Sequence, residues 1–127
     1  MKRVLLLVFA VCFVASVLGQ NAEAYRVKAE QGGASAQYQL GGYYFKGDGV
    51  VMNKYKAVMW ITKAAQQGHV GAQFSLGYCY ASGSGVPVNK YKAAEWYQKA
   101  AAKGYAPAQT CLGTWNELRA FAGILDD

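Results

Sequence analysis

The stretch AQFSLGYCYASGSGVPVNKYKAAEWYQKAAAKG, residues 72–104, decides the fold because most of its pattern has already occurred once in the chain. Residues 33–68 align with residues 69–104 without a gap, and 18 of the 36 aligned positions are identical. A fixed period of this length is typical of an array of supersecondary units, each too small to bury its apolar face alone. The duplication therefore predicts an all-α repeat solenoid.

Each copy predicts two helices joined by a glycine-containing turn. In the earlier copy, Ala36, Leu40 and Tyr44 recur every four residues, which places them on one face of a first helix over 34–46. Glycines then interrupt the helical pattern, because glycine adopts the backbone conformations that a tight turn needs. The second helices are expected over 54–67 and 90–103.

Several repeated residues are assigned to the frame of the fold. The glycines inside the first helices are expected to let a neighbouring helix come close, since glycine in a helix costs about 1 kcal/mol without such a reason. The tryptophans are large apolar anchors, and the asparagines are N-caps of the second helices. These residues are Gly41, Gly77, Gly113, Trp60, Trp96, Asn53 and Asn89.

Partial repeats are expected on both sides of the two complete copies. Residues 21–31 predict a helix equivalent to the end of a second helix, and residues 106–121 predict a further first helix with no second helix after it. Such terminal units cap repeat arrays. The expected division of the chain is a signal peptide (1–24), a leading half-repeat helix (25–35), repeat 1 (36–71), repeat 2 (72–107) and a C-terminal capping half-repeat (108–127).

The amino terminus has the layout of a secretory signal peptide. Lys2 and Arg3 precede an uncharged, mostly apolar run of 15 residues, Val4 to Leu18. This run is short for a membrane span, and cleavage is expected after Gly19 or Ala24. The sequence thus predicts an exported protein, periplasmic or secreted, with no transmembrane segment after cleavage. The alternative is an uncleaved anchor helix.

The repeated pattern, from Ala-Gln-x-x-Leu-Gly-x-x-Tyr through Gly-x-Gly-Val and Asn to Trp-x-x-Lys-Ala-Ala-x-x-Gly, resembles the Sel-1-like repeat, a relative of the tetratricopeptide repeat. The resemblance implies a helix–turn–helix solenoid that acts as an adaptor. It also implies that exported bacterial members take part in envelope processes, signalling or contact with host cells. A cysteine-rich branch of the family includes β-lactamase-like penicillin binders. This chain lacks the cysteines that branch carries near the ends of its second helices.

The charge balance is basic, with a net charge of +6 over the 127 residues. The lysines are spread over the repeats, and the plain interpretation is a solvated helix face. The alternative is attraction to an anionic surface or an acidic partner. Nucleic acid is not an expected partner, because the chain is expected to be exported and carries no recognised nucleic-acid-binding motif.

No set of residues predicts a catalytic centre, a metal site or a cofactor. His69 is the only histidine, and with no acid or cysteine close in sequence it is interpreted as a solvent-facing loop residue. Cys79 and Cys111 fall on neighbouring first helices, offset by one turn. This offset favours two free buried thiols over a disulfide, although a tilt between the repeats would bring the two cysteines closer.

The leading hypothesis is a non-enzymatic interaction module that binds a peptide or protein segment on the concave face formed by the first helices. Candidate binding residues are aromatics that change between the copies and glutamines that offer hydrogen bonds. They are Gln37, Tyr38, Tyr43, Gln73, Phe74, Tyr78, Gln109 and Trp115. The alternatives are an enzyme acting on cell-wall compounds, as in the penicillin-binding branch, and a structural unit that assembles with itself or with an envelope complex.

Overall fold

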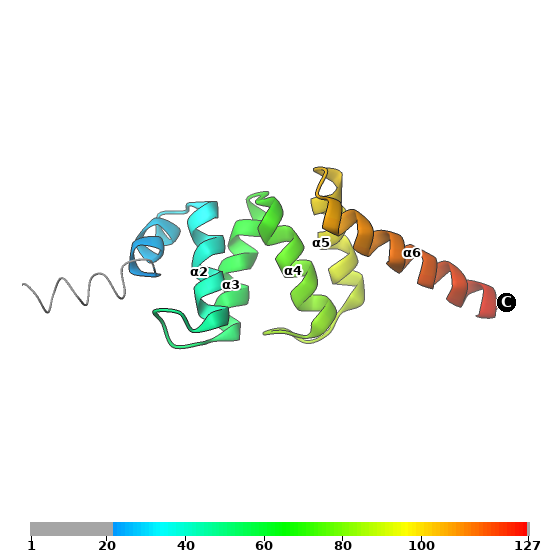
Figure 1. Ribbon diagram of the computed structural model, residues 1–127, viewed down its shortest axis with the longest axis horizontal. Coiled ribbons are helices and arrows are strands. Elements are labelled where there is room, and N and C mark those ends of the chain that lie inside the picture. Colours follow the sequence, from blue (N-terminus) through cyan, green and yellow to red (C-terminus); the bar gives the residue numbers. More distant parts are fainter. Residues whose placement is uncertain (1–21, 127) are drawn as a thin grey trace, which may run out of the picture.

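The computed structural model describes residues 22–126, and the surroundings of side chains for residues 22–120. The prediction of a signal peptide falls largely on residues outside this part of the chain. The described part forms six helices that follow one another in a row (Figure 1). They are residues 22–30, α2 (Ala34–Lys46), α3 (Lys54–Gln66), α4 (Val70–Ser82), α5 (Lys90–Ala102) and α6 (Ala106–Asp126).

The helices begin where the capping residues of the sequence place them. The Asn53 side chain accepts a hydrogen bond from the Lys56 N–H at 3.0 Å, and Asn89 accepts one from the Lys92 N–H at the same distance. Each bond satisfies a backbone donor that the first turn of a helix leaves unpaired. α3 and α5 therefore start at equivalent positions, one repeat apart.

The core lies between consecutive helices and consists mainly of alanine and branched apolar side chains, with the aromatic rings of Trp60 and Tyr97. Leu40 and Leu76, equivalent residues of α2 and α4, are 0% and 1% exposed. Leu76 packs in one cluster with Ala64 of α3, and Leu40 packs in another with Ala29 of the leading helix. Because alanine adds little bulk, each second helix contacts the first helix of its own repeat and that of the next.

Two of the helical glycines allow the close approach that the sequence predicts. A Cβ atom added to Gly41 would lie 2.5 Å from Ile61 Cγ1, and one added to Gly77 would lie 2.8 Å from the Tyr97 ring. Within each repeat, the second helix thus presses its large side chain onto the glycine of the first. The loss of helix propensity at these glycines is offset by this contact.

Gly113 does not follow this prediction. A Cβ atom added there would meet no atom within 4 Å. The reason is that α6 continues as a single helix to Asp126, where an ordinary first helix would turn back into its partner. The close-approach role therefore holds for Gly41 and Gly77, and Gly113 keeps only the sequence pattern.

Side-chain amides join one repeat to the next. The Gln37, Gln73 and Gln109 amides each donate to a backbone carbonyl eight residues earlier, those of Ala29, Ala65 and Ala101, all at 3.2 Å. The contact recurs at the period of the repeat and ties each first helix to the last turn of the helix before it. Within the described residues, no helix is long and apolar enough to cross a membrane.

Candidate functional site

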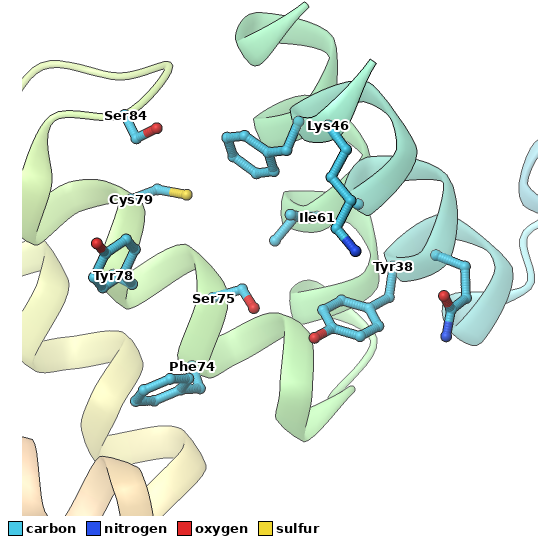
Figure 2. A pocket seen from close by; sticks show the side chains of 11 residues that line it. Tyr38, Lys46, Ile61, Phe74, Ser75, Tyr78, Cys79 and Ser84 are labelled. Atoms are coloured by element: carbon cyan, nitrogen blue, oxygen red, sulfur yellow. The ribbon is translucent and has the colours of Figure 1, made fainter. Parts of the chain in front are cut away.

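A groove of about 440 Å³ lies between the two equivalent first helices, α2 and α4. We call it the α2/α4 groove. Figure 2 shows Tyr38 and Lys46 on the α2 side, Ser75 and Cys79 on the facing α4 side, and Ile61 of α3 between them. The lining residues are Tyr38, Gln39, Gly42, Phe45, Lys46, Ile61, Phe74, Ser75, Tyr78, Cys79 and Ser84.

The groove combines an apolar surface with one positive charge. Ile61 provides aliphatic surface and Phe45 an aromatic ring. Three further aromatic rings come from Tyr38, Phe74 and Tyr78. Lys46 is the charged member of the lining, which contains no acidic residue. The arrangement suits an apolar side chain that lies beside a carboxylate, because an apolar pocket with a few placed polar groups is the usual form of a binding site.

Three of the candidate binding residues meet in this groove: Tyr38, Phe74 and Tyr78. Tyr78 is 60% exposed and carries a large surface that a partner would cover. Phe74 is held by two further rings, with its centroid 5.4 Å from that of Tyr97 and 5.2 Å from that of Tyr105. A ring held in this way contacts a partner at little cost in side-chain entropy.

The three glutamines were predicted to offer hydrogen bonds to a partner in a groove, and the structure gives them another role. Gln37 and Gln73 are only 5% and 4% exposed, and their amide nitrogens donate to the helix carbonyls described above. Gln109 makes the same contact at an exposed position. The three amides hold the repeats together, and their nitrogens are already engaged.

Tyr43 and Trp115 lie away from the α2/α4 groove. Tyr43 packs near Tyr25 of the leading helix, with ring centroids 5.8 Å apart. Trp115 lines a smaller hollow of about 220 Å³ that also involves α4 and α5, and its ring meets Tyr91 edge-on at 6.3 Å. Positions that align in the repeat thus lie in different environments at the two ends of the array.

Sequence reasoning did not find Phe45 and Lys46, which complete the groove. A usable signal was present, because these residues correspond to Ala81 and Ser82 in the later copy. They change between copies in the same way as the aromatics that were chosen. The predicted set of changing positions ends at Tyr43 in the first helix and does not include the last turn of that helix.

His69 is not the solvent-facing loop residue that the sequence predicted. It is the N-cap of α4, and its Nδ1 accepts a hydrogen bond from the Ala72 N–H at 3.0 Å. Its ring lies over the ring of Tyr38, with centroids 4.7 Å apart. Partial burial, with a contribution from the Lys103 charge, lowers the pKa of His69 below its ordinary value.

Because His69 caps α4, we expect the free energy of unfolding of the chain to depend on pH. Because the pKa of His69 is lower in the folded chain, the unfolded chain binds more protons below the ordinary value of 6.5, and acid favours unfolding. The contribution is present above that pH and is lost as the pH falls through the folded pKa. His69→Asn retains a capping oxygen that does not titrate. Urea unfolding should therefore show a smaller loss of stability on acidification in this variant than in the wild type. Equal losses would contradict the assignment.

The two cysteines of the described chain are free, as the sequence favoured. Cys79 is 2% exposed at the wall of the groove, and Cys111 is partly buried, which differs from the two buried thiols that were expected. Burial raises the pKa of the Cys79 thiol from 9.0 to about 11. Since the thiolate is the reactive form, Cys79 is expected to be inert.

The greater burial of Cys79 predicts that its thiol reacts more slowly with Ellman's reagent than the thiol of Cys111. At neutral pH a pKa two units above the ordinary value leaves about a hundredfold less thiolate, and burial slows reaction further. In a Cys12→Ser background, Cys79→Ser should react with Ellman's reagent about a hundredfold faster than Cys111→Ser, which retains only Cys79. Similar rates for the two variants would show that Cys79 is accessible.

Within the part of the chain that the structure describes, no three metal-binding side chains gather in one place. The distinguishing features of the described part are the α2/α4 groove and the aromatic residues around it.

Comparison with known proteins matches both repeats to a family. The model of the Sel1 repeat matches residues 34–69 and 70–105. These ranges have the expected period and begin two residues before the predicted boundaries at 36 and 72. A search of curated proteins found no match.

Solved structures give the same result. A Sel1 repeat protein from Oxalobacter formigenes is 39% identical, with a TM-score of 0.72 over 74% of this chain. The protective antigen c5321 of uropathogenic Escherichia coli is 42% identical, with a TM-score of 0.71 over 73% of this chain. The cysteine-rich protein B of Helicobacter pylori is 20% identical, with a TM-score of 0.69 over 81% of this chain and 92% of its own, and shows the fold alone.

The chain spans 39% of the length of the Oxalobacter protein and 20% of the length of c5321. What is shared is therefore the repeat unit and its stacking. The match covers both complete repeats, and each matched range contains one pair of helices, α2 with α3 and α4 with α5. The chain belongs to the Sel1 repeat family.

Proposed function

We propose that the chain is an exported, non-enzymatic interaction module that binds a peptide segment in the α2/α4 groove. The observation that carries the proposal is an apolar groove between equivalent helices, lined by Phe45, Ile61 and Tyr78, with Lys46 as its charge. The preferred segment has a large apolar side chain beside an aspartate or glutamate. Burial of the apolar group supplies affinity, and the lysine supplies orientation and selectivity.

Several features support this function. Sel1 repeats form stacked helices, and repeat arrays of this kind present extended surfaces for partners. The groove is lined at positions that differ between the copies, while many of the shared positions form the frame. Export is proposed from the layout of the amino terminus. The relative c5321 is described as a protective antigen, which agrees with a location outside the cytoplasm.

Selection from a random peptide library on the immobilised protein tests the proposal. Enriched peptides should pair an aromatic or leucine residue with a neighbouring acid, and Lys46→Gln should weaken the binding of acidic peptides more than that of their amide counterparts. Failure to enrich any sequence, or enrichment without an apolar residue, would count against the groove. Hydrolysis of nitrocefin above an inert-protein control would contradict the non-enzymatic part of the proposal.

A further inference from the structure

One edge of the molecule carries the same basic tripeptide twice. Lys-Tyr-Lys occurs at 54–56 and again at 90–92, at the starts of α3 and α5. The loops that lead into these helices lie at the same edge of the row, at the bottom of Figure 1. We call these two tripeptides, with the exposed apolar residues Val51, Met52 and Val88 before them, the basic edge.

The charges of the basic edge are placed where the helices themselves disfavour them. The N-terminus of a helix carries a partial positive charge, so acidic side chains are preferred in its first turn. The first turns of α3 and α5 contain no acidic residue and two lysines each. Within 47–56 and 83–92, the acidic residue is Asp48 alone. The helix ends and the lysines therefore add to one positive field.

Two of the four lysines are more available than the others. Lys56 lies over the Tyr44 ring at 5.6 Å, and Lys92 lies over the Tyr80 ring at 5.4 Å. Lys54 and Lys90 are exposed and have no such ring contact within the described residues. They are the residues whose replacement reports on a partner with least effect on the fold.

Apolar side chains are exposed beside these charges. Tyr55 is 79% exposed, Tyr91 is 75% exposed and Val51 is 89% exposed. Tyrosines and aliphatic residues flanked by lysine are the composition of surfaces that lie at the boundary between lipid headgroups and acyl chains. A polyanion without an apolar layer would use the lysines and leave these side chains in water.

We propose that the basic edge docks on a lipid bilayer that contains anionic lipids. Lys54 and Lys90 lie against headgroup phosphates, while Tyr55 and Val51 enter the interface. Charge complementarity to an anionic leaflet selects this partner, and the exposed apolar residues distinguish it from a soluble acidic chain. The basic edge shares no residue with the lining of the α2/α4 groove, so lipid docking and peptide binding are independent.

Sedimentation with vesicles of phosphatidylcholine and phosphatidylglycerol tests the proposal. All variants keep the same residues 1–21, so differences between them report on the edge. Lys54→Gln/Lys90→Gln is expected to bind about thirtyfold more weakly, since each lysine near an anionic surface contributes about fivefold. Binding of the wild type should also fall as salt is raised and as phosphatidylglycerol is removed.

Lys63→Gln/Lys99→Gln is the matched control, because it removes the same charge from later positions of the same two helices. Lys63 lies nine positions after Lys54 in the same helix, about 13 Å along the axis, which exceeds the screening length of about 10 Å at moderate salt. The control should retain binding within about twofold. Thermal unfolding followed by circular dichroism establishes that both variants are folded.

Val51→Ser/Tyr55→Ser tests the lipid itself, because it removes apolar surface and keeps the charge. It should weaken binding to anionic vesicles and leave binding to heparin unchanged. Three results would overturn the proposal: no binding of the wild type to anionic vesicles at low salt, an equal loss in the lysine control, or equal effects of Val51→Ser/Tyr55→Ser on vesicles and heparin. The last result would identify the partner as a soluble polyanion.

Discussion

Gly85→Ala is expected to lower the free energy of unfolding by about 2–5 kcal/mol. Gly85 has a φ of +73°, which costs a residue with a Cβ about 1–2 kcal/mol. The added Cβ atom would also lie 2.5 Å from the Lys54 carbonyl oxygen and 2.7 Å from Val58 Cγ2. Relieving this overlap adds a further cost of about 1–3 kcal/mol.

The contact explains why the effect is large. Gly85 belongs to the turn of the second repeat, yet the atoms it meets belong to α3 of the first repeat. The turn is therefore part of the interface between repeats. Urea unfolding measures the effect, and the expected loss is a large fraction of the total stability of a small domain.

Gly104→Ala is the matched control for Gly85→Ala. Gly104 has a φ of +86°, so it carries the same backbone strain, but a Cβ atom there meets nothing within 4 Å. Its expected cost is about 1–2 kcal/mol. If Gly85→Ala and Gly104→Ala destabilise the chain equally, the turn does not pack against α3 as described.

The sequence predicted the frame of the fold because the frame is what the two copies share. Asn53 marks the start of α3 through a cap that depends on a bond within a few residues. The helix boundaries lie within about two residues of those expected, except at α6, which continues to Asp126. Local chemistry, repeated twice, was sufficient for these features.

The groove was predicted only in part because it depends on how one repeat lies against the next. Tyr38 and Tyr78 are positions that change between the copies, and both line the groove. Tyr43 also changes between the copies, but it packs near Tyr25 of the leading helix. A repeat pattern gives the helix on which a residue lies, whereas the neighbouring repeat decides whether its side chain meets solvent, a cap or another ring.

His69 shows the same limit. In the sequence it stands alone in a connection between helices, where a histidine has no obvious role. Its function as a cap requires the backbone conformation of the turn before α4, and its stacking on Tyr38 requires the packing of two repeats. Neither follows from the residues next to it. The predicted steric role of Gly113 was wrong for a related reason, since no described residue lies within 4 Å of a Cβ atom added there.

Tyr78→Ala is expected to weaken the binding of a selected peptide by about thirtyfold or more, as removal of a central aromatic contact does in other interfaces. Tyr78 is 60% exposed in the free chain, so its loss removes contact surface without opening a core cavity. Fluorescence anisotropy of a labelled peptide measures the affinity, and unfolding curves should remain close to those of the wild type.

Tyr55→Ala is the control for this measurement. Tyr55 is 79% exposed and lies outside the groove lining, so its removal should leave the peptide affinity unchanged. If the peptide bound nonspecifically to exposed aromatic side chains, both variants would weaken its binding alike. Equal weakening by Tyr55→Ala and Tyr78→Ala would therefore show that the peptide does not use the groove.

The most direct test of peptide binding in the α2/α4 groove is to measure peptide affinity in a variant whose groove is filled by a new side chain. Gly42 lines the groove, and a Cβ atom there meets nothing within 4 Å, so a large side chain is accommodated only in the space that the peptide is proposed to occupy. Gly113→Trp, at another open helical glycine outside the groove lining, is the control. Peptide affinity should be lost in Gly42→Trp and kept in Gly113→Trp. Unchanged affinity in a folded Gly42→Trp would contradict binding in the α2/α4 groove.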